Sequence, residues 1–308
     1  MDVLSDALAA MRTGRTRSAR TDVRAPWGLR FPAITGTSFH VVLEGTCVLL
    51  PPGDDPPLAL GPGDVVFLRD GSAHALADAP DTPLTDFAPE RPDPSSPIGR
   101  VHVDGPGART ILLCGAYQLD RARPHPLMRE LPRLVRLSAH AELGRLVDLL
   151  AAEFARPRPG GDGIVPSLVD AMLLYLLRAW VEERATADDT PSGWARALAD
   201  HAVGRALHDM HARPGHPWTV AELAARSGLS RSVFAQRFTT LIGEPPMAYL
   251  TWWRMTSAGR LLREPGASVR TVAERVGYTS EFAFAKAFKR EYGVPPGAYR
   301  RPVPSPPA

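Results

Sequence analysis

Two sets of side chains, fifty residues apart, have the types that read the edges of nucleic-acid bases. The first set is Arg231, Ser232 and Gln236, and the second is Glu281, Phe282 and Lys286. Most of them are short or hydrogen-bonding side chains that could enter a major groove, and glutamine pairs best with adenine. These types predict two base-reading surfaces.

The two sets belong to a stretch that occurs twice. Residues 238–249 reappear as residues 288–299, and Phe234 matches Phe284 at the same offset. A repeat at a fixed spacing means that one supersecondary unit is used twice. We therefore expect two copies of one small helical unit between residues 218 and 301.

Each copy has the pattern of a helix, a tight turn and a second helix. In the first copy an apolar stripe at helical spacing is broken at Gly228, and Ser230 then caps the next helix. The second copy repeats this order with Gly277 and Ser280, and its turn is one residue longer. The expected inward faces are Phe234, Phe238 and Leu241 in the first copy, and Phe284 and Phe288 in the second. In such a helix-turn-helix unit one helix braces and the next faces solvent.

A long helix from Met247 to Leu262 would join the two copies and hold them about one turn of DNA (~34 Å) apart. Contacts to phosphate groups add affinity without sequence information. The candidates for such contacts are Arg237, Arg254, Lys289 and Arg290.

The charge is segregated along the chain. Residues 201–308 have a net charge of +8, whereas the rest of the chain has a net charge of −5. The simplest alternative is a helical bundle with a solvated basic face. The repeat, the caps and the charge together favour a polyanionic partner for the C-terminal part.

Residues from about 204 to 301 resemble the DNA-binding domain of the AraC/XylS transcription regulators. The matching pieces are Trp218-Thr-Val-Ala-Glu-Leu-Ala, Gly228-Leu-Ser-Arg-Ser-Val-Phe, Arg254-Met-Thr-Ser-Ala-Gly-Arg-Leu-Leu and the stretch from Val276 to Arg300. One position departs from the family, which usually has arginine where this chain has Gln236. The resemblance implies double-stranded DNA as a partner, and RNA polymerase as a further partner if the protein is an activator.

The N-terminal half has short strands separated by Gly and Pro. The expected strands are residues 39–43, 46–50, 58–60, 65–68, 101–103 and 110–113, with a hairpin turn at Glu44-Gly45. Residues 1–11 could form a helix, and residues 12–20 are expected to be a solvated connector. This pattern predicts a small antiparallel β-barrel or jelly roll. The expected fold class is α+β, with this barrel, a middle helical pair and an all-α double helix-turn-helix domain.

The segment from Gly63 to His74 resembles the second cupin motif, and His40 to Gly45 resembles a degenerate first one. The likeness covers roughly residues 5–135 and implies a cupin-like sensor domain. Metal-binding cupins use three histidines and a glutamate, whereas here His40 and His74 remain and Glu44 sits at the expected hairpin. We expect no metal and no cofactor. The two histidines either hydrogen-bond within the barrel or line an effector pocket for a small molecule.

Cys47 and Cys114 allow a redox interpretation, because some relatives respond to oxidants through cysteine. Cys114 closes an apolar run and is expected to be buried, where a thiol is unreactive. A cysteine-based oxidant switch and a metal-dependent cupin enzyme therefore stay as alternatives to effector sensing. No recognisable catalytic spacing occurs in the sequence, so we expect no enzyme activity.

Two apolar helices, over residues 138–154 and 165–184, resemble dimerisation helices, although they could also only cover their own barrel. The expected domains are 1–135 (cupin-like sensor), 136–193 (helical linker), 194–302 (DNA-binding) and 303–308 (disordered tail). The DNA-binding domain is expected to open with one helix over residues 194–210. No run of about 18 apolar residues occurs, and the first twenty residues do not have the order of a signal peptide, so a cytoplasmic location is expected.

Overall fold

The protein forms two compact units. The computed structural model describes residues 2–12, 14, 16–53, 55–90, 98–119, 125–138, 141–156, 158–186, 193–264 and 266–300. The sheet unit comprises residues 12–121 and 131–179, and the helical unit comprises residues 1–11, 122–130 and 180–308. These units divide the chain at other places than the expected domain bounds, which stay a prediction. The expected linker after residue 186 and the expected tail lie outside the described residues.

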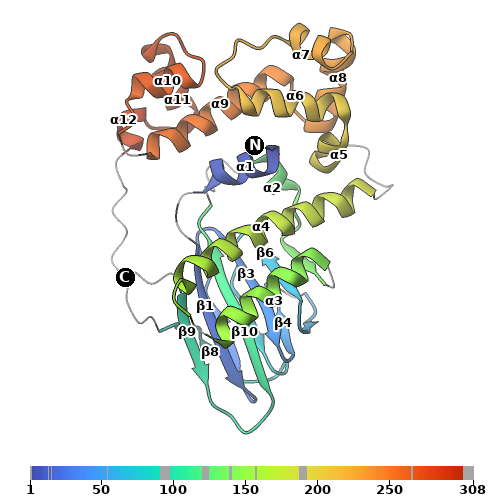
Figure 1. Cartoon of the computed structure of the whole chain (residues 1–308), viewed down its shortest axis with the longest axis vertical. Helices are drawn as coiled ribbons and strands as arrows, with labels where there is room; N and C mark the ends of the chain where they lie inside the picture. Colours follow the sequence, from blue (N-terminus) through green and yellow to red (C-terminus); the bar gives the residue numbers. More distant parts are fainter. Residues whose placement is uncertain are drawn as a thin grey trace. The chain divides into compact units, whose positions relative to one another are not determined.

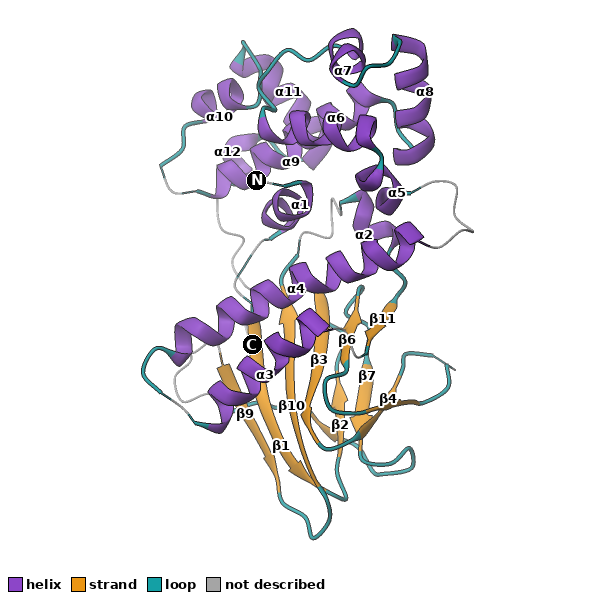
Figure 2. Ribbon diagram, turned by 45° about the vertical axis from the view of Figure 1, so that its right-hand side comes forward, coloured by secondary structure: helices purple, strands orange, loops and turns teal. Residues whose placement is uncertain are grey.

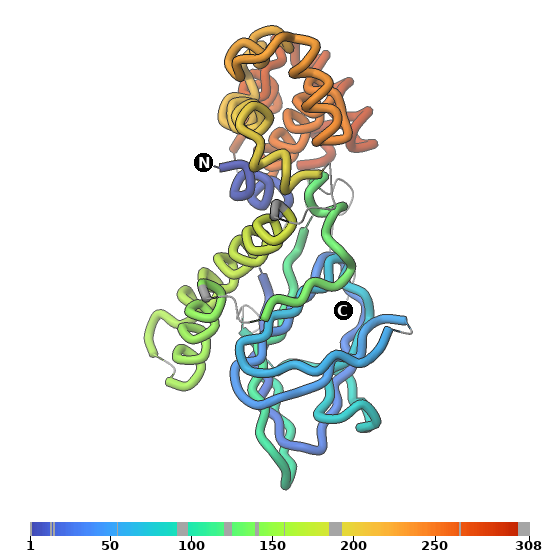
Figure 3. Tube along the Cα trace, turned by 90° about the vertical axis from the view of Figure 1, so that its right-hand side faces the viewer, coloured from blue at the N-terminus to red at the C-terminus, as the bar shows by residue number. Residues whose placement is uncertain are grey.

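The sheet unit is built from two β-sheets. The six-stranded sheet has the order β11 (Leu134–Leu137), β6 (Val65–Leu68), β3 (Thr37–Glu44), β10 (Arg109–Tyr117), β1 (Arg17–Arg24) and β9 (Ile98–Val103). The five-stranded sheet has the order β5 (Leu58–Leu60), β4 (Cys47–Leu50), β7 (His74–Ala77), β2 (Gly28–Phe31) and β8 (Thr85–Asp86). Figure 3 shows these strands as two layers.

Side chains alternate between the two faces of each strand, and this places one apolar set between the sheets. That core includes Trp27, Leu49, Leu76 and Leu112, all nearly inaccessible to solvent. The other face of the six-stranded sheet is covered by α3 (Ala141–Ala155) and α4 (Gly161–Thr186), as Figures 1 and 2 show. Strand β3 is therefore buried on both faces over most of its length.

Three expectations for this half were wrong. The expected α+β class is confirmed, but its closed and wholly antiparallel form is not, because the strands form two sheets that include two parallel pairs (β1 with β9, β2 with β8). Glu44-Gly45 is not a hairpin turn, because β3 and β4 lie in different sheets. Gly45 has a positive φ of 77°, and a Cβ there would lie 2.3 Å from the carbonyl oxygen of Arg109, so the chain passes between the sheets only with glycine at this point.

The third error concerns residues 12–20. Arg17–Arg24 is strand β1, which pairs with β10 on one side and β9 on the other. Its charged residues hid the alternation, since Arg20 and Asp22 stand between the inward-facing Ala19, Thr21 and Val23.

Helix α4 is also the one segment, among the described residues, that is long and apolar enough to cross a membrane by length and composition. An 18-residue window within residues 161–184 has a mean hydropathy of 1.6, although Asp170 and Arg178 interrupt its apolar residues, so the sequence holds such a segment without an unbroken apolar run. Half of that window is buried inside the protein, as in the core helix of a folded unit.

The helical unit holds α1 (Val3–Met11), α2 (Pro126–Glu130) and the C-terminal helices. The latter are α5 (Trp194–Ala199), α6 (His201–Ala212), α7 (Val220–Arg226), α8 (Arg231–Ile242), α9 (Pro246–Arg263), α10 (Val269–Arg275), α11 (Glu281–Tyr292) and α12 (Pro296–Tyr299). The single helix expected over residues 194–210 is two, because the Asp200 carboxylate accepts hydrogen bonds from the backbone N–H groups of Ala202 and Val203 and starts α6.

The repeat is confirmed as two helix-turn-helix pairs, α7–α8 and α10–α11. Ser230 and Ser280 cap the second helix of each pair, and Gly243 and Gly293 end it in the left-handed conformation. Helix α9 runs between the two pairs (Figure 1). The inward face of α8 was predicted one residue out of place, because Ile242 is buried with Phe234 and Phe238 while Leu241 is only partly buried.

Candidate nucleic-acid interface and effector pocket

Helices α8 and α11 each turn one face inward and the other to solvent. Phe284 and Phe288 of α11 are fully buried against α9 and α10, as Phe234 and Phe238 of α8 are in the first pair. The predicted base readers are all exposed: Arg231, Ser232 and Gln236 on α8, and Glu281, Phe282 and Lys286 on α11. The caps and breakers thus present each set on one helix, beginning in its first turn.

The predicted phosphate contacts fall into two groups. Lys289 and Arg290 are exposed on α11, and Arg290 contacts only its neighbour Glu291, at 3.3 Å, among the ion pairs of the described residues. Arg237 is half exposed and its guanidinium forms an ion pair with Asp200, the cap of α6. Burial alone would raise the pKa of Asp200, but the N–H of Val203 and the Arg237 guanidinium outweigh it and hold that pKa below its ordinary value.

Arg254 has a different place. Its guanidinium is half buried and donates to the backbone carbonyls of Pro214 (2.7 Å) and His216 (2.8 Å), in the loop before α7. Burial lowers the pKa of this group. Arg254 therefore ties α9 to the loop before the first helix-turn-helix pair.

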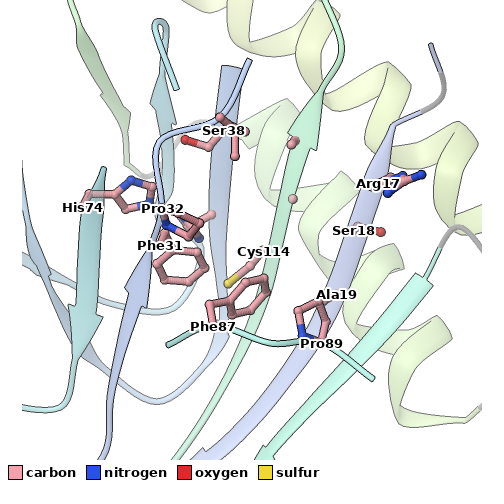
Figure 4. A pocket seen from close by; sticks show the side chains of 14 residues that line it. Arg17, Ser18, Ala19, Phe31, Pro32, Ser38, His74, Phe87, Pro89 and Cys114 are labelled. Atoms are coloured by element: carbon pink, nitrogen blue, oxygen red, sulfur yellow. The ribbon is translucent and has the colours of Figure 1, made fainter. Parts of the chain in front are cut away.

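A pocket of about 250 Å³ opens between the two sheets of the sheet unit (Figure 4). Its wall is mainly apolar, with the rings of Phe31 and Phe87 at 4.4 Å centroid separation and the Cys114 thiol. Arg17 also lines it; this side chain is exposed, and no ion pair of it occurs among the described residues.

His40 and His74 stand side by side in this wall, although 34 residues separate them. Their Nε2 atoms lie 2.6 Å apart, and Nδ1 of His74 lies 2.8 Å from the carbonyl oxygen of Ser72. That carbonyl can only accept, so Nδ1 of His74 carries the proton, and Nε2 of neutral His74 accepts from Nε2–H of His40. Burial lowers the pKa of both imidazoles, and for His40 the charge of His74 adds to it. Among the residues that the structure describes, the buried Nδ1 of His40 has no hydrogen-bond partner, and in this tautomer it carries a lone pair.

Both halves of the chain match known families. The cupin family matches residues 2–182, more than half of the chain, and the helix-turn-helix domain family matches residues 223–302. A protein of Streptomyces lividans that is named as an AraC-like transcription regulator is 34% identical over 305 residues, which cover 98% of each chain. The chain belongs to the AraC-like transcription regulators.

The chain is also similar to a further transcription regulator and to a solved DNA-binding domain. The regulator is 28% identical to the RCS-specific HTH-type transcriptional activator RclR of Escherichia coli K12, over 98% of both chains. Among solved structures it is similar to the DNA-binding domain of AdpA in complex with a target DNA, with 35% identity, a TM-score of 0.31, and coverage of 33% of this chain and 90% of that one.

The geometry of this regulator bears on the metal-ligand candidates. His40 and His74 meet, but Glu44 ends β3 with its side chain 57% exposed, near Arg109. No group of three His, Cys, Asp or Glu side chains that could hold a metal occurs within the part of the chain that the structure describes.

The two cysteines are free and buried in the same core cluster. They stand on β4 and β10, one in each sheet. Burial raises the pKa of Cys47 to about 12 and raises that of Cys114 still further. Both groups are therefore thiols at neutral pH, which are weak nucleophiles.

Sequence reasoning missed a cluster that joins distant parts of the helical unit. The Glu130 carboxylate of α2 accepts a hydrogen bond from the backbone N–H of Trp194, the first residue of α5, at 2.9 Å. The ring of His125 lies edge-on to that of Trp194 at 4.5 Å, and Nδ1 of His211 lies 3.8 Å from Asp6 of α1. No local periodicity signals such contacts, because their partners are 64 residues or more apart.

Proposed function

We propose that this regulator reads two consecutive major-groove segments of double-stranded DNA, one with α8 and one with α11. Arg231, Ser232 and Gln236 would contact bases in the first segment, and Glu281, Phe282 and Lys286 in the second. Lys289 and Arg290 would contact phosphates. The observation that carries the proposal is the presentation of both sets from capped, solvent-facing second helices of a duplicated helix-turn-helix unit. The proposal does not include Arg254 and Arg237 among the phosphate contacts, because Arg254 donates to backbone carbonyls and Arg237 is paired with Asp200.

The pocket in the sheet unit is proposed as the effector site. Its apolar wall with a few polar groups suits a small, mostly apolar molecule, and His40, His74 and Arg17 are the groups that would orient it. Effector binding would shift the regulator between states that differ in affinity for DNA. We further propose that the protein acts in the cytoplasm as a homodimer without catalysing a reaction, and that it contacts RNA polymerase where it activates.

The test of the DNA-binding proposal starts with a DNA site that the full chain selects from a pool of random duplexes. Gln236→Ala should weaken binding to that site by ~1–3 kcal/mol and relax the preference at one base pair only. Lys289→Ala should weaken binding to every sequence and lower the slope of log K against log salt by about one.

Arg178→Ala provides the control, since it also removes an exposed positive charge, here from α4 of the sheet unit. An equal loss on all sequences for Gln236→Ala would make that residue a backbone contact. An unchanged salt slope for Lys289→Ala would remove the lysine from the phosphate contacts.

A further inference from the structure

Phe282 is the most exposed of the large apolar side chains that the structure describes. It is 81% exposed, whereas Phe284 and Phe288 of the same helix are fully buried. Phe282 belongs to the first turn of α11, two residues after the capping residue Ser280. Oγ of Ser280 accepts a hydrogen bond from the backbone N–H of Ala283 at 3.3 Å. The N-terminal turn of the second helix is the part of a helix-turn-helix unit that reaches base edges.

The neighbours of Phe282 on the helix surface decide which partner fits. Residues four and seven positions further lie on the same face of a helix, and here they are Lys286 and Lys289, both exposed. The buried Phe284 and Phe288 lie on the opposite face. A phenyl ring followed by two cations at helical spacing suits an apolar spot inside an anionic groove, and it does not suit an apolar protein surface.

DNA offers one apolar group in the major groove, the C5 methyl group of thymine. We propose that Phe282 reads thymine in the second DNA segment through contact with this methyl group. The proposal rests on the proposed function, since it assumes that α11 lies in the major groove.

The first reading helix differs at the matching place. Fifty residues earlier stands Ser232, and the same stripe of α8 continues with Gln236 and Thr239, so it holds no phenyl ring and no cation. The two halves of the DNA site should therefore be read by different chemistry. We expect hydrogen-bonding selection in the half that α8 contacts and selection for a thymine methyl group in the half that α11 contacts.

The test removes the methyl group and the ring independently. The DNA site selected by the full chain is synthesised with each thymine replaced singly by deoxyuridine, which lacks only the C5 methyl group. With the wild-type protein, one or two replacements in one half of the site should weaken binding about fourfold each, the effect of one buried methyl-sized group. With Phe282→Ala these replacements should have no effect, while the unmodified site binds about as weakly as the modified site binds the wild type.

Two variants make the reading specific. Phe282→Leu keeps an apolar side chain and should retain part of the methyl effect. Val294→Ala removes another exposed apolar side chain just after α11 and should leave the effect unchanged. Because Phe282 is exposed and lies in a helix, its replacement by alanine is not expected to disturb folding.

Three outcomes would overturn the proposal. Deoxyuridine could be tolerated at every position, Phe282→Ala could weaken binding without altering the methyl effect, or Phe282→Ala could leave DNA binding unchanged. The second outcome would indicate that the Phe282 ring stacks on a base or inserts between bases. The third would indicate that Phe282 contacts a protein and not DNA. Failure of the wild-type chain to select any sequence would instead contradict the proposed function itself.

Discussion

The same type of side chain has different roles in this regulator, depending on whether it is buried or exposed. Phe284 packs in the core and Phe282 stands in solvent two residues earlier. The His40 and His74 pair shows the same principle for a titrating group, because a neutral imidazole can share one proton with its neighbour while two imidazolium groups at 2.6 Å would repel each other. The doubly protonated pair is therefore disfavoured, and burial disfavours a charge on either ring.

This gives a prediction for pH. Both histidines have a pKa below the ordinary 6.5 in the folded protein, so the unfolded chain binds protons that the folded one resists. Their contribution to stability is fully present above pH ~6.5 and is lost as the pH falls below it, by up to about 1.4 kcal/mol per pH unit for each histidine. Thermal unfolding of the sheet unit between pH 7.5 and 5 measures this loss.

The variant His40→Gln/His74→Gln should have a flatter dependence of stability on pH, whatever its stability at pH 7.5. His102→Gln, which replaces an imidazole that is 63% exposed, should keep the wild-type dependence. Equal slopes in all three proteins would show that the buried pair does not govern the response.

At the scale of elements, the helix-turn-helix pairs depend on α9 for their orientation. Arg254 of α9 holds the loop before α7 by two hydrogen bonds, and its Nη2 would lie 3.1 Å from a Cβ at Gly277, the turn of the second pair. One side chain thus holds the loop before the first pair and lies near the turn of the second. We infer that Arg254 positions the reading helices and that its charge strengthens these two hydrogen bonds.

We therefore expect Arg254→Ala to lower the free energy of unfolding of the helical unit by about 2 kcal/mol, since it leaves two half-buried carbonyl groups without a charged donor. Denaturant unfolding followed by helix signal measures the change. The salt dependence of DNA binding should stay at the wild-type slope, in contrast to Lys289→Ala. A reduced slope with unchanged stability would return Arg254 to the phosphate contacts.

At the scale of the whole molecule, neither compact unit is formed from one continuous stretch of the sequence. Helix α1 begins the sequence and packs in the helical unit against α6 and α9, where Asp6 approaches His211 and the carbonyl oxygen of Ala10 accepts from Arg263 at 3.2 Å. Residues 1–11 and 122–130 thus complete the helical unit together with the C-terminal helices. A fragment that starts at Trp194 lacks them.

Met11 offers a direct test, because it ends α1, is only 2% exposed, and its sulfur accepts from the backbone N–H of His125. Met11→Ala should destabilise the helical unit by ~3 kcal/mol through the cavity that it leaves. Faster amide hydrogen exchange in α6 and α9 would report this loss. Leu149→Ala, at a position 55% exposed on α3, is the control and should change neither. Wild-type protection in Met11→Ala would mean that α1 adds nothing to the unit.

The sequence by itself determined the features that a few neighbouring residues encode. Glycine breakers, serine caps and apolar spacing fixed the two helix-turn-helix pairs and the faces that carry the readers, and the motif residues indicated the family. The short strands β4, β5 and β6 were found for the same reason, because turn residues bound them closely.

Tertiary structure decided everything that depends on partners far along the chain. Strand pairing placed β3 and β4 in different sheets and made a strand of the arginine-rich segment from Arg17 to Arg24. Tertiary packing also brought His40 to His74, Arg254 to the loop before α7, and α1 to the helical unit. Periodicity reports which face of an element is apolar, whereas its packing partner is set by the free energy of the whole fold.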